Sequence, residues 1–306
     1  NGRLGDGTTV DRNTPTQTLS LGIGRTAVAI SAGGGHACAI LDNGSVSCWG
    51  WNYNGGLGDG TTVDRNTPTQ TLNLGIGRTA VAISAGAQHS CALLDNGSVS
   101  CWGYANLGAL GNGSVPGGEQ HTPTLTSTLG VNRSAVAISS GGLHTCAILD
   151  NGSISCWGYG SGGRLGNADT SNKFIPTLTS SLGASRTAVA LSSGDSHTCA
   201  ILDDGSVSCW GDGGSGRLGN GGTSNQNSPT LTSSLGTGRT AIALSSGNAY
   251  TCAILDNGSV SCWGRGNNGQ LGNGWFGTDN HYKETTPTLT SSLGVGRTVA
   301  VSERDS

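Results

Sequence analysis

Residues 36–50 read HACAILDNGSVSCWG, and this stretch decides the fold. Asp-Asn-Gly between two short apolar runs is typical of a β-hairpin. Two loops fit these letters. A two-residue loop, Asn43-Gly44, leaves Cys38 opposite Trp49, whereas a three-residue loop ending at a left-handed Gly44 sets Cys38 opposite Cys48.

Only the second register brings the two cysteines together. Directly opposed residues in an antiparallel pair have Cα atoms about 4.5–5.5 Å apart, which suits a disulfide. We therefore expect the three-residue loop. Because side chains alternate along a strand, Cys38, Ile40, Val46 and Cys48 then share one face.

The same frame recurs five times and uses all ten cysteines. Successive frames begin 53, 55, 53 and 53 residues apart, a period typical of propellers and solenoids. Free thiols are an alternative, and zinc is not expected because each hairpin offers only two ligands. We predict the disulfides Cys38–Cys48, Cys91–Cys101, Cys146–Cys156, Cys199–Cys209 and Cys252–Cys262, which implies an oxidising compartment, secreted or at the cell surface.

Around each hairpin the repeat carries two further extended segments. In the first repeat, residues 25–31 alternate as a strand does, and residues 67–72 include a proline, as an outer edge strand can. Four short strands per unit form a propeller blade, so the predicted class is an all-β propeller with five complete blades and one split, incomplete blade. The expected boundaries, within one repeat domain, are 1–24 (partial), 25–77, 78–132, 133–185, 186–238, 239–296 and 297–306 (partial).

The repeat resembles the regulator-of-chromosome-condensation repeat along essentially the whole chain. The matching residues include Leu57, His89, Gly97 and the pair Trp102-Gly103. The resemblance implies a propeller, usually seven-bladed, that acts as an interaction platform. Some members promote nucleotide exchange on a small GTPase, some inhibit secreted enzymes, and one plant branch senses ultraviolet light through clustered tryptophans.

The chain departs from that family in three ways. Cysteines replace apolar strand residues, Tyr250 stands where the other frames have histidine, and no acidic wedge-like insertion of the exchange factors is present. These departures point to a secreted, disulfide-bearing branch. An exchange factor or an enzyme is only a distant third expectation.

Charge and hydropathy argue against nucleic acid as a partner and against a membrane-spanning segment. A net charge of −3 with 11% charged residues does not give the basic footprint that nucleic acid requires. No apolar run is long enough to span a membrane. The Asp6–Asp11 loop and its copy at 59–64 could hold calcium, but a turn role is favoured, so we expect no metal and no cofactor.

Binding residues are sought where the repeats differ. The loop after Leu271 carries Trp275, Phe276 and Tyr282, which have no counterparts in other blades, and Trp51 with Tyr53 forms a smaller cluster. These aromatic residues suit a partner contact, although they could instead cover a blade edge.

The repeats do not begin and end at the ends of the chain, so one blade is divided between its two ends. Residues 297–302 supply a first strand and residues 14–20 an outer strand, but the hairpin between them is absent. Either the segment belongs to a longer chain or a neighbouring copy completes the blade. The expected function is a non-catalytic, extracellular structural or self-assembling component, such as a filament subunit, that binds protein or copies of itself. The alternative is a monomeric adhesion or inhibitor platform for a protein or glycan.

Overall fold

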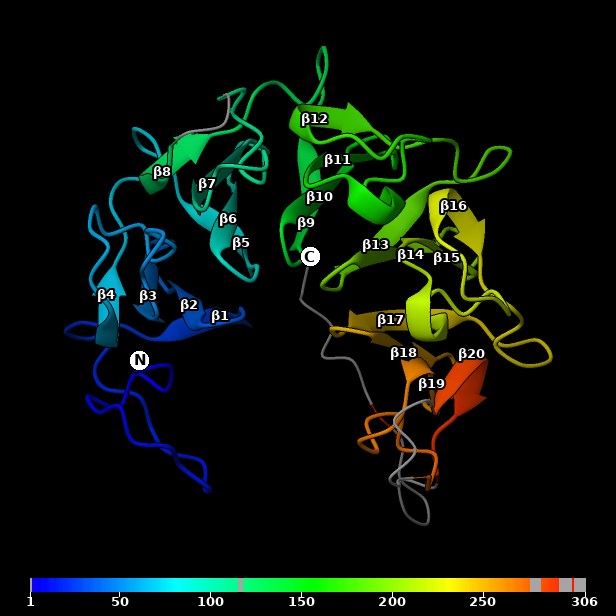
Figure 1. The fold of residues 1–306 in the computed structure, drawn as a ribbon. Helices are drawn as coiled ribbons and strands as arrows, with labels where there is room; N and C mark the ends of the chain where they lie inside the picture. Colours follow the sequence, from blue (N-terminus) through cyan, green and yellow to red (C-terminus); the bar gives the residue numbers. More distant parts are fainter. Residues whose placement is uncertain (1, 115–117, 276–281, 292–298, 300–306) are drawn as a thin grey trace. The chain divides into compact units, whose positions relative to one another are not determined.

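The described residues form twenty strands, which follow the period read from the sequence. The computed structural model of the 306-residue chain describes residues 2–114, 118–275, 282–291 and 299. Its strands form five separate four-stranded antiparallel sheets, each with its strands in chain order (Figure 1). The all-β class and the four-stranded blades predicted from the sequence are confirmed.

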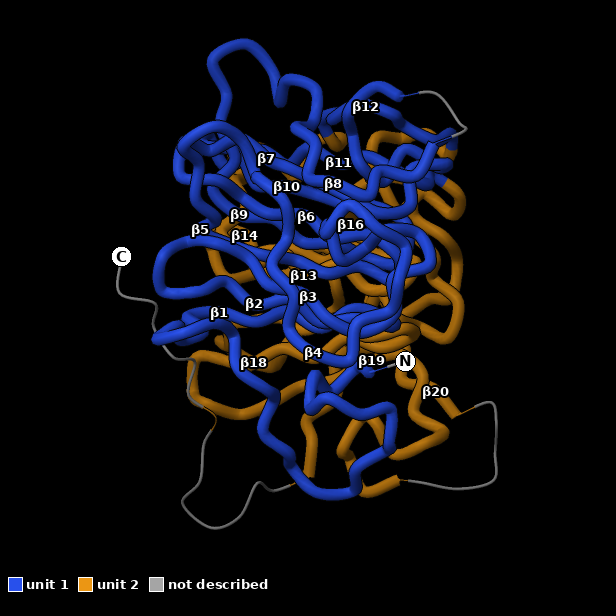
Figure 2. The backbone as a smooth tube through the Cα atoms, turned by 90° about the vertical axis from the view of Figure 1, so that its left-hand side faces the viewer, with its two compact units in different colours: residues 1–160, 171–178 blue, residues 161–170, 179–306 orange. Residues whose placement is uncertain are grey.

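The sheets fall into two compact units, coloured separately in Figure 2. Unit 1 comprises Asn1–Gly160 with Ser171–Leu178, and unit 2 comprises Ser161–Thr170 with Thr179–Ser306. We name the sheets blades A to E in chain order, so that unit 1 holds blades A, B and C and unit 2 holds blades D and E.

The strands of unit 1 are as follows. Blade A contains β1 (Ala27–Ala32), β2 (His36–Leu41), β3 (Val46–Gly50) and β4 (Arg65–Gln70). Blade B contains β5 (Ala80–Ala85), β6 (His89–Leu94), β7 (Val99–Gly103) and β8 (Gln120–Leu125). Blade C contains β9 (Ala135–Ser140), β10 (His144–Leu149), β11 (Ile154–Gly158) and β12 (Lys173–Leu178).

Unit 2 repeats the arrangement and adds two short 3-10 turns. Blade D contains β13 (Ala188–Ser193), β14 (His197–Leu202), β15 (Val207–Gly211) and β16 (Gln226–Leu231). Blade E contains β17 (Ala241–Ser246), β18 (Tyr250–Leu255), β19 (Val260–Arg265) and β20 (Lys283–Leu289). The 3-10 turns are η1 (Ser161–Gly163) and η2 (Gly214–Gly216).

The hairpin has the three-residue loop. In blade A, Leu41 N–H donates to Ser45 O at 2.8 Å, and Gly44 has φ +75°, a conformation that glycine adopts without strain. Cys38 lies directly opposite Cys48, with their Cα atoms 4.1 Å apart. All five predicted cysteine pairs are disulfide-bonded in the structure.

Apolar cores lie between neighbouring blades in both units. In unit 1, Cys38, Ile40, Val46 and Cys48 of blade A pack against the opposite face of blade B, including Trp102. Blade B packs on blade C in the same way, and blade D packs on blade E. The two faces predicted from side-chain alternation are therefore the two sides of these blade-to-blade cores.

One expected strand is not formed. Residues 14–20 were expected as an outer strand, but no strand lies within residues 2–24. A strand needs a neighbour to pair its backbone groups, and this segment has no hairpin of its own beside it. Of the expected first strand at 297–302, only Val299 lies among the described residues, and its N–H donates to Gly258 O at 3.1 Å.

No helix among the described residues has the length and apolar character needed to cross a membrane.

Candidate binding surfaces

A polar clasp joins neighbouring blades. His36 Nε2 of blade A lies 2.7 Å from Ser90 Oγ of blade B, and the Ser90 hydroxyl donates to Gly56 O of blade A at 2.9 Å. A hydroxyl has one proton, so the imidazole must donate through Nε2–H. Blade A therefore holds the Ser90 hydroxyl from two sides.

The clasp repeats in both units. His89 Nε2 lies 2.9 Å from Thr145 Oγ1, and His197 Nε2 lies 2.8 Å from Thr251 Oγ1. The two threonine hydroxyls donate to backbone oxygens of the preceding blade's loop, as Ser90 does. His36, His89 and His197 therefore each form a hydrogen bond between two blades.

Burial keeps these imidazoles neutral. It lowers the pKa of His36 to about 4, and it lowers the pKa of His89 and of His197 to about 3. The Nδ1 atoms of His89 and His197 are buried without a hydrogen-bond partner among the described residues. A neutral Nδ1 with a lone pair fits such a site, whereas a protonated imidazolium would leave an unsatisfied buried charge.

A tryptophan completes the blade contact. The indole N–H of Trp102 in blade B donates to Gly56 O at 2.8 Å, and that of Trp263 in blade E donates to Arg217 O at 3.0 Å. The Leu-Gly turn of the preceding blade lies on the indole, so closely that a Cβ on Gly58 would come within 2.8 Å of the ring. This approach explains the glycine at the Leu-Gly turns that meet an indole, as Gly58 does.

The arginines that precede the first strand of each blade form ion pairs within their own blades. In the described residues, each arginine that precedes a first strand pairs with the aspartate of its own hairpin turn. The pairs are Arg25–Asp42, Arg78–Asp95, Arg133–Asp150, Arg186–Asp203 and Arg239–Asp256, at 3.0 to 3.4 Å. Arg297 lies outside the described residues, and each of the other five is engaged in an ion pair.

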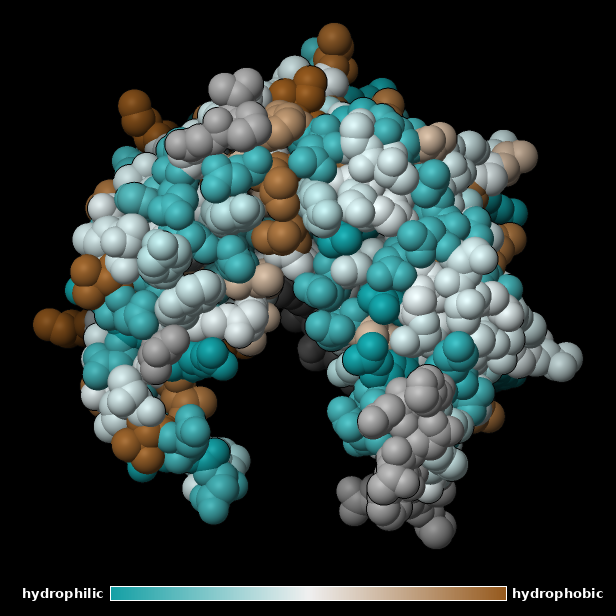
Figure 3. Space-filling view, viewed as in Figure 1, coloured by the Kyte–Doolittle hydropathy of each residue, from teal (hydrophilic) through white to brown (hydrophobic). Residues whose placement is uncertain are grey.

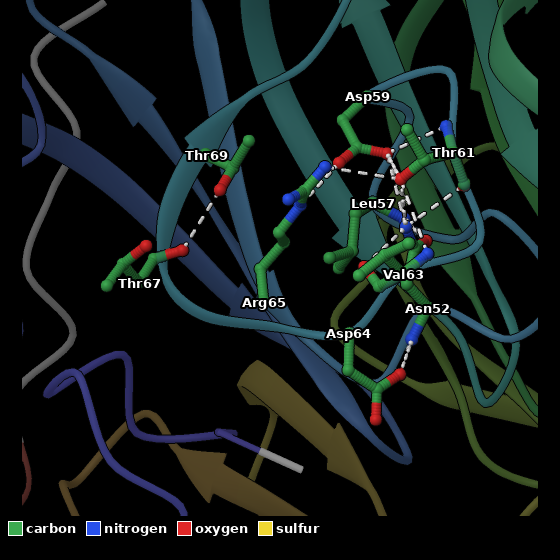
Figure 4. A network of polar contacts seen from close by, with 9 residues as sticks. All are labelled: Asn52, Leu57, Asp59, Thr61, Val63, Asp64, Arg65, Thr67 and Thr69. Carbon is green, nitrogen blue, oxygen red and sulfur yellow. Dashed lines mark hydrogen bonds and ion pairs between the residues drawn. The ribbon is translucent and has the colours of Figure 1, made fainter.

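In the loop of residues 59–64, which the sequence offers as a calcium candidate, the Asp59 carboxylate is bound by donors of the protein itself (Figure 4). Asp59 accepts hydrogen bonds from the backbone and hydroxyl of Thr61 and pairs with Arg65 Nε at 2.8 Å. Burial alone would raise the pKa of Asp59, but these donors outweigh it and hold that pKa below its ordinary value. The carboxylate acts as the centre of a turn.

Asn52 organises the same loop. Its Oδ1 accepts from Leu57 N–H at 3.0 Å, while its Nδ2 donates to Val63 O at 3.1 Å. Asp64 then accepts the Asn52 backbone N–H at 2.8 Å (Figure 4). Among the described residues no three His, Cys, Asp or Glu side chains come together as a metal site.

The two predicted aromatic clusters are real ring pairs. Trp51 and Tyr53 stack with ring centroids 6.1 Å apart, and Tyr53 is 67% exposed. Trp275 and Tyr282 stack at 3.7 Å. Phe276, predicted to accompany them, lies outside the described residues.

Tyr282 is held in place by polar contacts. Its hydroxyl accepts from Asn273 Nδ2 at 2.8 Å and donates to Glu284 Oε1. Burial, and then the bond to the Glu284 carboxylate, raises the pKa of Tyr282 above its ordinary value. These contacts hold the half-buried ring of Tyr282 in one orientation against Trp275.

Sequence reasoning missed two aromatic residues at the position equivalent to Trp51 in other blades. Tyr104 and Tyr159 follow Trp-Gly as Trp51 does, and the backbone N–H of each donates to the residue before the clasp histidine. All three are half-buried and belong to unit 1. In unit 2 the same position holds Asp212 and Arg265. Aligning the residue after each Cys-Trp-Gly would have revealed this aromatic set.

Most of the face seen in Figure 3 is polar or neutral, with apolar side chains in separate small patches. Such scattered apolar residues are ordinary on a water-exposed surface.

Comparisons with known proteins agree on the fold. A family model described as the RCC1-like domain matches residues 1–303. Human E3 ubiquitin-protein ligase HERC2 is 33% identical over 204 residues, which is 66% of this chain and 4% of that protein. The Ultraviolet-B receptor UVR8 of Arabidopsis thaliana is 34% identical over 198 residues, which is 64% of this chain and 44% of the receptor. The chain thus matches less than half the length of either relative.

Two solved structures are similar in fold. Yeast RCC1 (Prp20), in its complex with Kap60, has a TM-score of 0.76 at 20% identity, covering 89% of this chain and 62% of that one. Human WBSCR16 has the same TM-score and identity, covering 87% of this chain and 67% of that one.

Proposed function

The chain belongs to the RCC1-like domain family, and from that premise we propose an extracellular, non-catalytic propeller that binds protein as a structural or self-assembling surface component. The fold supports a protein-binding propeller. One solved structure with the same fold is yeast RCC1 (Prp20) bound to Kap60. Another is Prp20p of Saccharomyces cerevisiae, described together with its binding to Gsp1p and histones.

The observation that carries the extracellular part is the set of five disulfides. Each joins directly opposed residues of one hairpin, and each is repeated at the same register. Disulfides persist in oxidising compartments and are rare where thiols are kept reduced. In the cytosol the same ten cysteines would be kept as thiols, and the five pairs would not form lasting disulfides.

The repetition itself favours binding over catalysis. The hairpin disulfides and the Arg–Asp ion pairs recur in all five blades, whereas a catalytic site needs one unlike set of groups. Residues 4–33 and 57–86 differ only at Ser20 and Asn73, as expected of a modular array.

Self-assembly is tested by size-exclusion chromatography with light scattering over a wide concentration range. A structural component should show reversible growth in mass, and dilution should reverse it. A single monomeric mass at every concentration would remove the self-assembling form of the proposal.

The second candidate is a monomeric platform for protein or glycan, and the stacked aromatic pairs favour it. Binding to extracellular proteins and to a glycan array would be compared for the native chain and two double variants, Trp51→Ala with Tyr53→Ala and Trp275→Ala with Tyr282→Ala. Loss of a partner at unchanged thermal stability would assign that pair as the contact. Unchanged binding by both variants would reject both surfaces.

A further inference from the structure

Unit 1 carries, on blades A and B, a group of aromatic and amide residues that the repeat does not require. Trp51 and Tyr53 follow the third strand of blade A, and their rings stack with centroids 6.1 Å apart and planes 10° apart. Tyr53 is 67% exposed, and Trp51 is half-buried. Two nearly parallel rings at the surface offer a flat apolar platform to a ligand.

Gly35 supports the Trp51 ring. The backbone N–H of Trp51 donates to Gly35 O at 2.9 Å, and a Cβ on Gly35 would come within 3.1 Å of the indole. The glycine therefore lets the indole lie directly against the backbone. Larger residues hold the equivalent position of the other blades, namely Gln88, Leu143, Ser196 and Ala249.

Gln88 connects this platform to blade B. Asn54, the chain neighbour of Tyr53, donates through Nδ2 to Gln88 Oε1 at 2.8 Å. Gln88 O accepts the backbone N–H of Tyr104 at 3.0 Å, and Tyr104 is half-buried. Tyr53 of blade A and Tyr104 of blade B are thus linked through one hydrogen-bonded pair of amide side chains.

The amide pair keeps hydrogen-bonding groups for a ligand. The bond between the two side chains uses Gln88 Oε1 and one N–H of Asn54. Within the part of the chain that the structure describes, no further hydrogen bond involves Gln88 Nε2 or Asn54 Oδ1. Gln88 Nε2 can therefore donate and Asn54 Oδ1 can accept, next to the exposed aromatic rings.

The full set occurs once in the sequence. At the boundary between blades B and C, leucines stand at the positions equivalent to Asn54 and Gln88, namely Leu107 and Leu143. Two leucines cannot form the amide pair. Residues repeated in every blade serve the repeat, whereas a set of exposed aromatic and amide residues present at one boundary is typical of a binding site.

The chemistry of this set suits a neutral sugar chain. A sugar ring has a C–H face that can lie on an aromatic ring, and its hydroxyl groups both donate and accept hydrogen bonds. All five side chains are uncharged, so nothing in the set favours an acidic ligand. A proline-rich peptide also packs on aromatic rings, but proline has no N–H to donate to Asn54 Oδ1.

We propose that Trp51, Tyr53 and Tyr104, with the amide pair Asn54–Gln88, form a binding site for a neutral glycan. Sugar rings lie on the stacked pair, and their hydroxyl groups bond to the two amides. Tyr104 extends the surface across the blade boundary. This inference rests on the second proposed function, the binding platform, to which it assigns a ligand class and a site. It is independent of self-assembly.

The probes are four neutral hexasaccharides, namely cellohexaose, chitohexaose, mannohexaose and maltohexaose. Each is titrated into the native chain and followed by isothermal titration calorimetry and by tryptophan fluorescence. Of the seven tryptophans, five are at most 3% exposed, so direct contact with a sugar is open to Trp51 and Trp275. We expect saturable binding of at least one hexasaccharide, with a change in emission that Trp51→Phe removes.

Variants locate the site. Trp51→Ala with Tyr53→Ala should weaken binding about tenfold or more, because the stacked surface is lost. Gln88→Leu introduces the residue that blade C has at this position and should weaken binding severalfold. Trp275→Ala with Tyr282→Ala removes the other stacked pair and should leave binding unchanged. Since Gln88→Leu removes no ring, it tests the site even if the first double variant folds poorly.

Absence of saturable binding to every hexasaccharide would overturn the proposal. Equal losses from the two aromatic double variants, or an unchanged affinity after Gln88→Leu, would overturn it as well. Decaproline is titrated in parallel, and its binding at Trp51 without any hexasaccharide bound would assign the site to a proline-rich peptide instead. None of these results bears on self-assembly, which light scattering tests separately.

Discussion

His36 of blade A and Ser90 of blade B are 54 residues apart in sequence, and their Nε2 and Oγ atoms lie 2.7 Å apart in the buried boundary between the blades. The same bond recurs from His89 to Thr145 and from His197 to Thr251. It is a directional contact added to an apolar core of modest size, and it fixes the register of one blade on the next.

Removing one partner of this bond should destabilise the protein. Ser90→Ala leaves the His36 N–H buried without an acceptor, which costs about 1–3 kcal/mol. We expect a lower unfolding midpoint in urea. Ser100→Ala is the matched control in the same blade, because the Ser100 hydroxyl is buried without a partner among the described residues. Equal losses from the two substitutions would show that the clasp contributes nothing.

Mild acid should weaken the fold through the buried histidines. Folding lowers the pKa of His36 to about 4 and that of His89 and His197 to about 3, from an ordinary value of 6.5. Their stabilising contribution is complete above pH 6.5 and is lost as the pH falls toward the folded pKa. Each histidine changes the free energy of unfolding by about 1.4 kcal/mol per pH unit in this window.

The measurement is urea unfolding between about pH 5 and 6.5, where carboxylates remain ionised. His89→Gln keeps a side-chain N–H for Thr145 and does not titrate, so it should reduce the slope by one histidine's share. A pH-independent midpoint over this range, or a variant with the native slope, would contradict the assignment of neutral buried imidazoles.

The disulfides should differ in accessibility. Cys38, Cys91, Cys146 and Cys199 are fully buried, whereas Cys252 of blade E is half-buried. Under native conditions, limiting dithiothreitol followed by alkylation should therefore label Cys252 and Cys262 first. Peptide mapping by mass spectrometry reads the order directly. Earlier labelling of any other pair would indicate that the hairpin face carrying Cys252 and Cys262 is covered in solution.

Local patterns in the sequence predict the fold well. The letters Asp-Asn-Gly determine the hairpin register, because only one loop length puts Cys38 opposite Cys48, and the five-fold repetition extends that result to every blade. The strands follow from alternation of apolar residues. These features depend on residues close together in the chain, where backbone geometry leaves few choices.

Contacts between blades were harder to predict. That His36 meets Ser90, or that Gly58 meets Trp102, depends on how one sheet lies on the next, which local spacing does not specify. The outer strand expected at residues 14–20 failed for a related reason, since pairing needs a neighbouring strand. The aromatic residues Tyr104 and Tyr159, by contrast, are visible in the sequence as the residues that follow Trp-Gly.

The central claim is that this is a disulfide-bonded propeller made for an oxidising environment. Non-reducing peptide mapping of freshly isolated native protein, alkylated at the moment of lysis or harvest, tests it most directly. The account predicts five crosslinked peptide pairs, each joining cysteines ten residues apart, from Cys38–Cys48 to Cys252–Cys262. Ten alkylated, unpaired cysteines, or bridges between different blades, would contradict it.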